Sequence, residues 1–178
     1  MSGHNKWSKI KHKKAATDAQ KSKVFGKLAR FIAVESKKVG GDINSASLRV
    51  AMEKAKQSNM PIENINRAIQ KGKTDTSATP ESVLYEAYGP GGIAIIISGL
   101  TDNRNRTAAE IKHILAKQGL SLAEPGAASW AFEKDGEEYK AKTTTPISKE
   151  DEERLNGVVD AILDNDDVQD VYTNEVVN

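Results

Sequence analysis

The chain contains no cysteine among its 178 residues, and this absence removes several classes of chemistry at once. Disulfide bonds, cysteine-ligated zinc sites and thiol nucleophiles are all excluded. Aromatic residues make up 5% of the sequence and hydrophobic residues 38%, so the apolar core is limited in size. No apolar run approaches the roughly 20 residues that span a membrane. The composition suits a cytoplasmic protein without a membrane partner, and we expect no signal peptide ahead of the basic stretch that starts at residue 3.

The residue patterns of common catalytic and metal sites are missing as well. The three histidines, His4, His12 and His113, have no metal-binding spacing, and no Gly-x-Ser-x-Gly elbow is present. Asp166 and Asp167 are adjacent carboxylates, but they stand in a predicted helix-to-strand turn, where aspartate is common. We therefore predict no catalytic residue, no metal, no cofactor and no small-molecule substrate. A nuclease that uses Asp166 and Asp167 is the enzymatic alternative.

Charge is distributed very unevenly along the chain, although the net charge is only +1. Residues 1–79 contain 17 Lys and Arg against 6 Asp and Glu, a net of +11. Residues 80–178 contain 9 against 19, a net of −10. Such asymmetry suggests a nucleic-acid or membrane partner for the basic half. The acidic half is expected to face solvent or a basic protein, or to fold back on the basic half as an autoinhibitor.

The most concentrated positive charge lies in residues 3–14, which hold five lysines, two histidines, one tryptophan and no acidic residue. Lysine contacts phosphate as a point charge and releases condensed counterions, and a tryptophan can stack on an exposed base. The alternative is a solvated basic tail whose tryptophan packs on the domain behind it. The stretch supplies the first predicted nucleic-acid-binding residues: Lys6, Trp7, Lys9, Lys11, His12, Lys13 and Lys14.

Three amphipathic helices are predicted in the basic half. The first covers residues 15–39 and ends at Gly40-Gly41; Lys21, Lys23, Lys27 and Arg30 fall largely off its apolar face and complete the predicted nucleic-acid-binding set. The second runs from about residue 44 to 57. The third is opened by Pro61 and stopped by Gly72, with Ile62, Ile65 and Ile69 facing the core.

The turn at residues 59–61 raises the question of a helix-turn-helix. The helix after this turn offers side chains that can read base edges: Asn64, Asn66, Arg67, Gln70 and Lys71. A three-helix arrangement alone says nothing about function. We favour the simpler interpretation, an ordinary polar helix face.

The acidic half predicts an α+β domain. Strands are expected at residues 83–88 and 93–100, the second buried on both faces, with a Gly-Pro-Gly-Gly turn between them that lacks the Lys-Ser/Thr ending of a phosphate loop. A helix capped by Thr107 and Glu110 runs to Gln118, and a short strand follows at 120–123. A hairpin turns at Asp135-Gly136, and a helix from Ser148 precedes a strand at 168–172.

With the hairpin counted as one unit, the order after the first strand is β-α-β-β-α-β, the ferredoxin-like split βαβ pattern. Residues 73–82 lack apolar periodicity, and the charge changes sign there. The predicted domains are therefore a basic helical domain at 1–73, a linker at 74–82 and an acidic ferredoxin-like domain at 83–178.

The loop before the second-half helix is rich in hydrogen-bonding side chains: Asp102, Asn103, Arg104, Asn105 and Arg106. The two arginines can grip phosphates or a carboxylate in a bidentate manner. Alternatively, Asp102 pairs with an arginine and the loop caps its own helix. From the residues alone we favour this structural role slightly.

Several long motifs closely resemble the YebC/PmpR family, whose relatives include the mitochondrial translational activator of cytochrome oxidase. The motifs extend from end to end of the chain: residues 3–16, Asn59-Met60-Pro61 with Asn64-Ile65, residues 88–92, residues 100–107 and residues 166–174. Members usually carry a further small domain before the final helix. Here residues 134–148 alone fill that gap, so the chain resembles a short form with two domains.

The resemblance implies a non-enzymatic nucleic-acid-binding regulator of gene expression, either a DNA-binding transcriptional regulator or a ribosome-associated translation factor that binds ribosomal RNA. It also implies that residues 3–14 bind nucleic acid and that the 102–106 loop is a secondary functional surface. A protein-interaction adaptor is the alternative from another class. There the acidic domain would bind a partner protein, which the 102–106 loop would help to hold.

Overall fold

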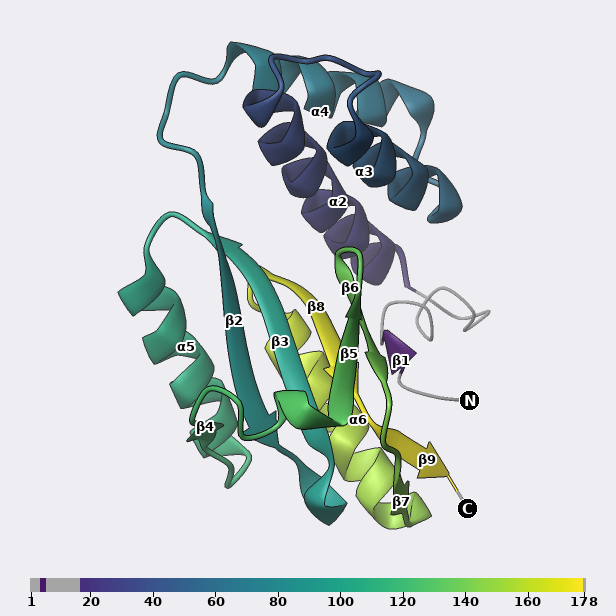
Figure 1. Cartoon of the computed structure of the whole chain (residues 1–178), viewed down its shortest axis with the longest axis vertical. Coiled ribbons are helices and arrows are strands. Elements are labelled where there is room, and N and C mark those ends of the chain that lie inside the picture. Colours follow the sequence, from purple (N-terminus) through teal and green to yellow (C-terminus); the bar gives the residue numbers. More distant parts are fainter. Residues whose placement is uncertain (1–3, 6–16, 178) are drawn as a thin grey trace. The chain divides into compact units, whose positions relative to one another are not determined.

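The computed structural model describes residues 4–5 and 17–177, which form two compact units (Figure 1). One is a helical unit within residues 17–81. The other is an α+β unit made of residues 82–177 together with residues 4–5. The predicted α+β class, with three N-terminal helices followed by a sheet-and-helix domain, is confirmed.

The helical unit contains α2 (Asp18–Lys38), α3 (Ala46–Gln57) and α4 (Ile62–Thr74). A reciprocal capping box starts α2. The Gln20 backbone N–H donates to the Thr17 hydroxyl, and the Thr17 backbone N–H donates to the Gln20 side-chain oxygen. Because Thr17 is the N-cap, the helix begins at Asp18 and not at residue 15 as predicted. The predicted stop at Gly40-Gly41 is confirmed, and both glycines have positive φ.

Two predictions for the third helix are wrong. Gly72 does not end α4, which continues to Thr74; it lies buried against α2, where a Cβ atom would come within 2.1 Å of the Ala33 carbonyl oxygen. Ile62 is not in the core but 56% exposed. Ile62 lies in the first turn of α4, at the edge of the buried face that contains Ile65 and Gly72.

The α+β unit is built on a five-stranded sheet in the order β1-β8-β3-β2-β4. These strands are β1 (His4–Asn5), β8 (Val168–Thr173), β3 (Ala94–Thr101), β2 (Glu81–Tyr88) and β4 (Leu122–Ala123). Since β2 lies between β3 and β4, the segment β3-α5-β4 is a split βαβ unit. The predicted hairpin, β5 (Phe132–Asp135) and β6 (Glu138–Ala141), forms a separate two-stranded sheet and adds no strand to the main one.

The main sheet is covered on both faces (Figure 1). On one face the hairpin packs over Ala94, Ile96 and Tyr172, and the Tyr139 and Tyr172 rings meet edge to face at 5.4 Å. In Figure 1, α6 (Lys149–Leu163) passes behind the sheet, and α5 (Arg104–Lys117), which contacts α6, is seen to the left of β2. Strand β3 is buried along nearly its whole length, as predicted.

Local details differ from the sequence predictions in two places. Helix α5 begins at Arg104 with Asn103 as its N-cap, three residues before the predicted start at Thr107. In the hairpin, Asp135 pairs with Glu138, so the turn residues are Gly136 and Glu137, one position later than predicted.

The segment after the hairpin is anchored to the C-terminal end of the main sheet. Strand β7 (Thr145–Ile147) pairs in parallel with β9 (Glu175–Val177). The buried Asn174 side chain accepts from the Ala94 N–H at 2.8 Å and donates to the Thr143 carbonyl at 3.0 Å. These bonds tie residues 143–147 to β3 and β9.

Candidate nucleic-acid interface

The basic N-terminal stretch begins as an edge strand of the α+β unit. His4 lies opposite Thr173, and Asn5 opposite Tyr172, in an antiparallel pair with β8. The predicted domain 1–73 is therefore divided differently in the structure, because these two residues join the sheet and not the helices. The predicted binding residues Lys6, Trp7, Lys9, Lys11, His12, Lys13 and Lys14 lie outside the described residues.

The four cations predicted on α2 differ in exposure. Lys21 and Lys23 are exposed and Arg30 is half-buried. Lys27, in contrast, is only 7% exposed, because its position turns toward the buried side of α2 beside Leu28 and Val24. A phosphate-contacting lysine needs an accessible ammonium group, so Lys27 is left out of the surface proposed below.

The polar residues predicted on the third helix are mostly accessible. Asn66, Arg67, Gln70 and Lys71 are exposed on α4, while Asn64 is half-buried. The residues between them, Ile65, Ala68 and Ile69, are buried. Helix α4 therefore presents one continuous polar face to solvent.

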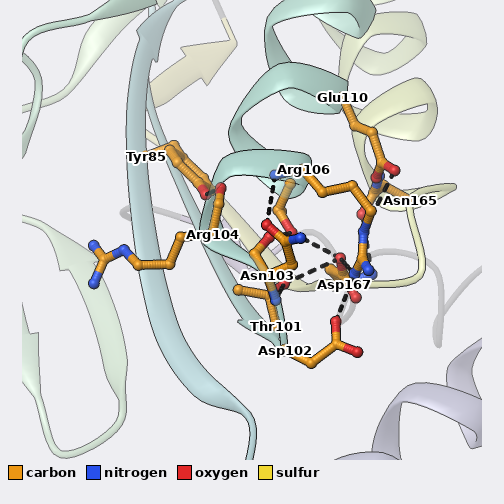
Figure 2. Close-up of polar contacts among 10 residues, drawn as sticks. Tyr85, Thr101, Asp102, Asn103, Arg104, Arg106, Glu110, Asn165 and Asp167 are labelled. Carbon is orange, nitrogen blue, oxygen red and sulfur yellow. Dashed lines mark hydrogen bonds and ion pairs between the residues drawn. The ribbon is translucent and has the colours of Figure 1, made fainter.

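In the α+β unit, the residues of the 102–106 loop fold into a hydrogen-bonded cap for α5 (Figure 2). The Asn103 side chain accepts from the Arg106 N–H at 3.0 Å. The Arg106 guanidinium donates to Asp102 and to Asp167, both at 2.8 Å. Hydrogen bonds to Asp167 and then Asp102 raise the pKa of Arg106 above its ordinary value. Both parts of the structural role considered above, a pairing with Asp102 and a cap, are observed.

Asp167 is the centre of this arrangement, and the sequence prediction did not assign it that role. Its carboxylate is 8% exposed and also accepts from the Thr107 hydroxyl at 2.7 Å. Thr107, predicted as a helix cap, is instead a buried partner of Asp167 and Thr101. No local pattern distinguishes Asp167 from the exposed Asp166, because the contacts come from residues 60 positions earlier.

The two arginines of the loop are therefore not equivalent. Arg106 is held among carboxylates, with Glu110 as a third at 3.7 Å. The Arg104 side chain extends away from this network (Figure 2) and is exposed.

Replacing Asp167 with asparagine is expected to lower the free energy of unfolding by about 2 kcal/mol, because a buried charged acceptor for Arg106 and Thr107 is lost. Urea denaturation followed by circular dichroism measures this change. The neighbouring Asp166→Asn replacement changes an exposed carboxylate and should stay within about 0.5 kcal/mol of the parent protein. Equal effects at the two positions would contradict the role assigned to Asp167.

Among the residues that the structure describes, no group of three or more histidine and carboxylate side chains is arranged to hold a metal ion. None of the helices in the described part of the chain is long and apolar enough to cross a membrane. The two units differ in charge. The helical unit has 12 Lys and Arg against 7 Asp and Glu in residues 17–81, whereas the α+β unit is acidic.

The fold and charge separation define a two-unit α+β protein whose helical part is basic. Two family models match the chain: the TACO1/YebC protein N-terminal domain over residues 5–75, and the TACO1/YebC second and third domain over residues 80–138. The chain belongs to the TACO1/YebC family, in agreement with the resemblance read from its motifs.

Relatives of the chain are named as regulators. A "probable transcriptional regulatory protein" of Pseudothermotoga lettingae is 39% identical over 236 residues, covering 98% of this chain and 93% of the relative. One of Thermotoga petrophila is 53% identical over 138 residues, covering 76% and 54%. The crystal structure of a conserved hypothetical protein from Aquifex aeolicus has a TM-score of 0.80 at 31% identity and covers 97% of both chains.

The comparisons also bear on the expected short form. The match to the Pseudothermotoga protein extends over 236 positions, more than the 178 residues of this chain, so that relative has residues without a counterpart here. The second family model stops matching at residue 138, in the β5–β6 hairpin. Residues beyond it complete β6 and form β7, α6, β8 and β9.

Proposed function

We propose that this protein is a non-enzymatic nucleic-acid-binding regulator of gene expression, and specifically a DNA-binding transcriptional regulator. The observation that carries the proposal is the +11 charge of residues 1–79 beside the −10 charge of residues 80–178. The names of the relatives support the transcriptional role. The cytoplasmic location expected from the sequence is compatible with this activity.

The basic half supplies the phosphate contacts in this proposal. They come from the lysines of residues 6–14 with Lys21, Lys23 and Arg30 of α2, and Trp7 and His12 add stacking or groove contacts. Neutralised phosphates release counterions, so the affinity should fall linearly with salt on a logarithmic scale, with a slope of roughly −0.9 per phosphate. The acidic unit would be repelled by the same polyanion and stay off it.

A ribosome-associated translation factor is the second candidate, and the observation in its favour is the acidic α+β unit. Ribosomal RNA offers phosphates to the basic half, while the acidic unit, with its net charge of −10 over residues 80–178, can meet basic proteins. In the adaptor alternative, that second contact would be the main one.

Reversing the charge of Lys9, Lys11, Lys13 and Lys14 to glutamate should abolish nucleic-acid binding. We expect the affinity for duplex DNA at low salt to fall by about a thousandfold or more, with a shallower salt dependence, because four phosphate contacts become repulsive. Fluorescence anisotropy over a salt series measures both quantities.

The matched control reverses four exposed lysines of the acidic unit: Lys112, Lys117, Lys134 and Lys149. It makes the same change in net charge and should weaken binding far less. Unchanged affinity in the first variant would refute the proposal. Sedimentation with ribosomes, beside a gel shift in the same buffers, separates the two candidates: salt-resistant co-sedimentation with weak, sequence-indifferent DNA binding identifies a translation factor.

A further inference from the structure

The turn between α3 and α4 has a conformation that is uncommon outside glycine. Asn59 has φ +58°, and no other non-glycine residue in the described part of the chain has a positive φ. Asparagine tolerates this left-handed conformation better than most residues. Residues 58–61 join the end of α3 to the start of α4, and a short turn of this length joins the two helices of a helix-turn-helix.

Buried residues of α3, α4 and the turn itself fix the conformation of the turn. Met60, at its centre, is 6% exposed, and its N–H donates to the Ala55 carbonyl of α3 at 3.0 Å. Ala55 is fully buried, as is Ile65 in the first full turn of α4. This packing fixes the direction in which α4 leaves the turn, which a helix that reads bases requires.

Helix α4 turns two parallel rows of polar side chains outward. Asn66 and Gln70 form an amide row, and Arg67 and Lys71 form a cationic row, each spaced by four residues and therefore on one face. Ile62, 56% exposed, lies at the start of the same face. Nothing in the described helical unit covers these side chains.

These side chains match the chemistry of base edges in the major groove. Asn and Gln form paired hydrogen bonds with adenine, Arg and Lys with guanine, and an apolar side chain contacts the thymine methyl group. Four residues of helix rise about 6 Å, close to two base-pair steps of about 3.4 Å. The helix with its side chains is about 10–12 Å wide, which suits a groove of about 12 Å.

We infer that α3 and α4 form a helix-turn-helix and that α4 enters the major groove of B-form DNA, where Asn66, Arg67 and Gln70 read the base sequence. Arg49 and Lys56 are exposed on α3 and contact the flanking phosphates, since the first helix of such a motif crosses the backbone. The inference rests on the proposed function and adds a sequence-reading surface separate from the basic N-terminal stretch.

The test selects bound DNA from a library of duplexes with a randomised centre and then compares the selected duplex with a scrambled one. The α4 variant carries Asn66→Ala, Arg67→Ala and Gln70→Ala, which keep good helix formers at exposed positions. The control variant carries Lys117→Ala and Gln118→Ala, an exposed cation and amide of the α+β unit. Affinities for both duplexes are measured in one buffer for the parent protein and all variants.

The expected result is a preference of the parent protein for the selected duplex, lost by about 100-fold in the α4 variant and kept in the control. The α4 variant should still bind the scrambled duplex, because its phosphate contacts remain. Binding of both duplexes without preference, or a preference that survives in the α4 variant, overturns the inference and leaves the proposed function intact. Binding of RNA but not duplex DNA overturns it too, since a helix cannot read the narrow major groove of A-form RNA.

Discussion

Replacing Gly72 with alanine is expected to lower the free energy of unfolding of the helical unit by about 3 kcal/mol. An added Cβ would lie 2.1 Å from the Ala33 carbonyl oxygen and 2.8 Å from the Ser36 Cβ, and overpacking against backbone cannot relax by a side-chain rotation. Separating α2 from α4 would also stretch the 2.7 Å hydrogen bond from the Ser36 hydroxyl to the Ile69 carbonyl. Urea denaturation followed by far-ultraviolet circular dichroism measures the loss.

Gly26 provides the matched control in the same unit. It stands in the middle of α2, is exposed, and has no atom within 4 Å of an added Cβ. Gly26→Ala should therefore stabilise the protein by up to about 1 kcal/mol, because alanine loses less conformational entropy in a helix. A Gly72→Ala protein as stable as the parent would show that α2 and α4 do not meet at this distance.

Replacing Glu86 with glutamine is expected to cost about 3 kcal/mol at neutral pH. The carboxylate is 6% exposed and accepts three backbone N–H groups at 2.7 Å, from Gly126, Ala128 and Ser129. Glutamine presents one oxygen instead of two and no charge, so at least one buried N–H loses its acceptor. Amide hydrogen exchange at Ala128 and Ser129 reads the loosening of this loop directly.

The effect of Glu86 on stability should depend on pH in one direction. Burial raises its pKa, but the hydrogen bonds from the three N–H groups lower it more, so the net pKa is below the ordinary 4.5. A carboxyl group with a depressed pKa in the folded state stabilises the protein above about 4.5 and loses this effect as the pH falls through the folded value. The gap between parent and Glu86→Gln should therefore close in acid. Glu133→Gln, at an exposed position, should change stability little at any pH.

The type and order of most elements could be read from the sequence. Local periodicity reports which face of a segment is buried, so α2, α3, α5, α6 and the doubly buried β3 were all expected within a few residues. The predicted helix end at Gly40-Gly41 and the predicted helix start at Ser148 were also correct. The Ser148 hydroxyl accepts from the Asp151 N–H at 3.1 Å. Charge counts and motifs were sufficient to indicate the family.

Long-range contacts were beyond reach of the same reasoning. Gly72 looked like a helix stop because glycine often is one, and its real role depends on Ala33, far away in the chain. Thr107 and Glu110 have the spacing of a capping box, but Asp167 takes the Thr107 hydroxyl and Asn103 becomes the cap. Asp102 and Arg106 are four residues apart on a helix start, so their pairing was the part of the candidate site that the sequence could suggest.

By itself, the sequence determined the composition of the two halves, the helices and strands, and the concentration of positive charge at residues 3–14, because these follow from residue identity and local spacing. Only the tertiary structure decided that β5 and β6 leave the main sheet, and that His4 pairs with Thr173 and Asn5 with Tyr172. Strand neighbours and buried partners depend on contacts between residues that are distant in the sequence. A local pattern of residues does not specify which distant residue forms each contact.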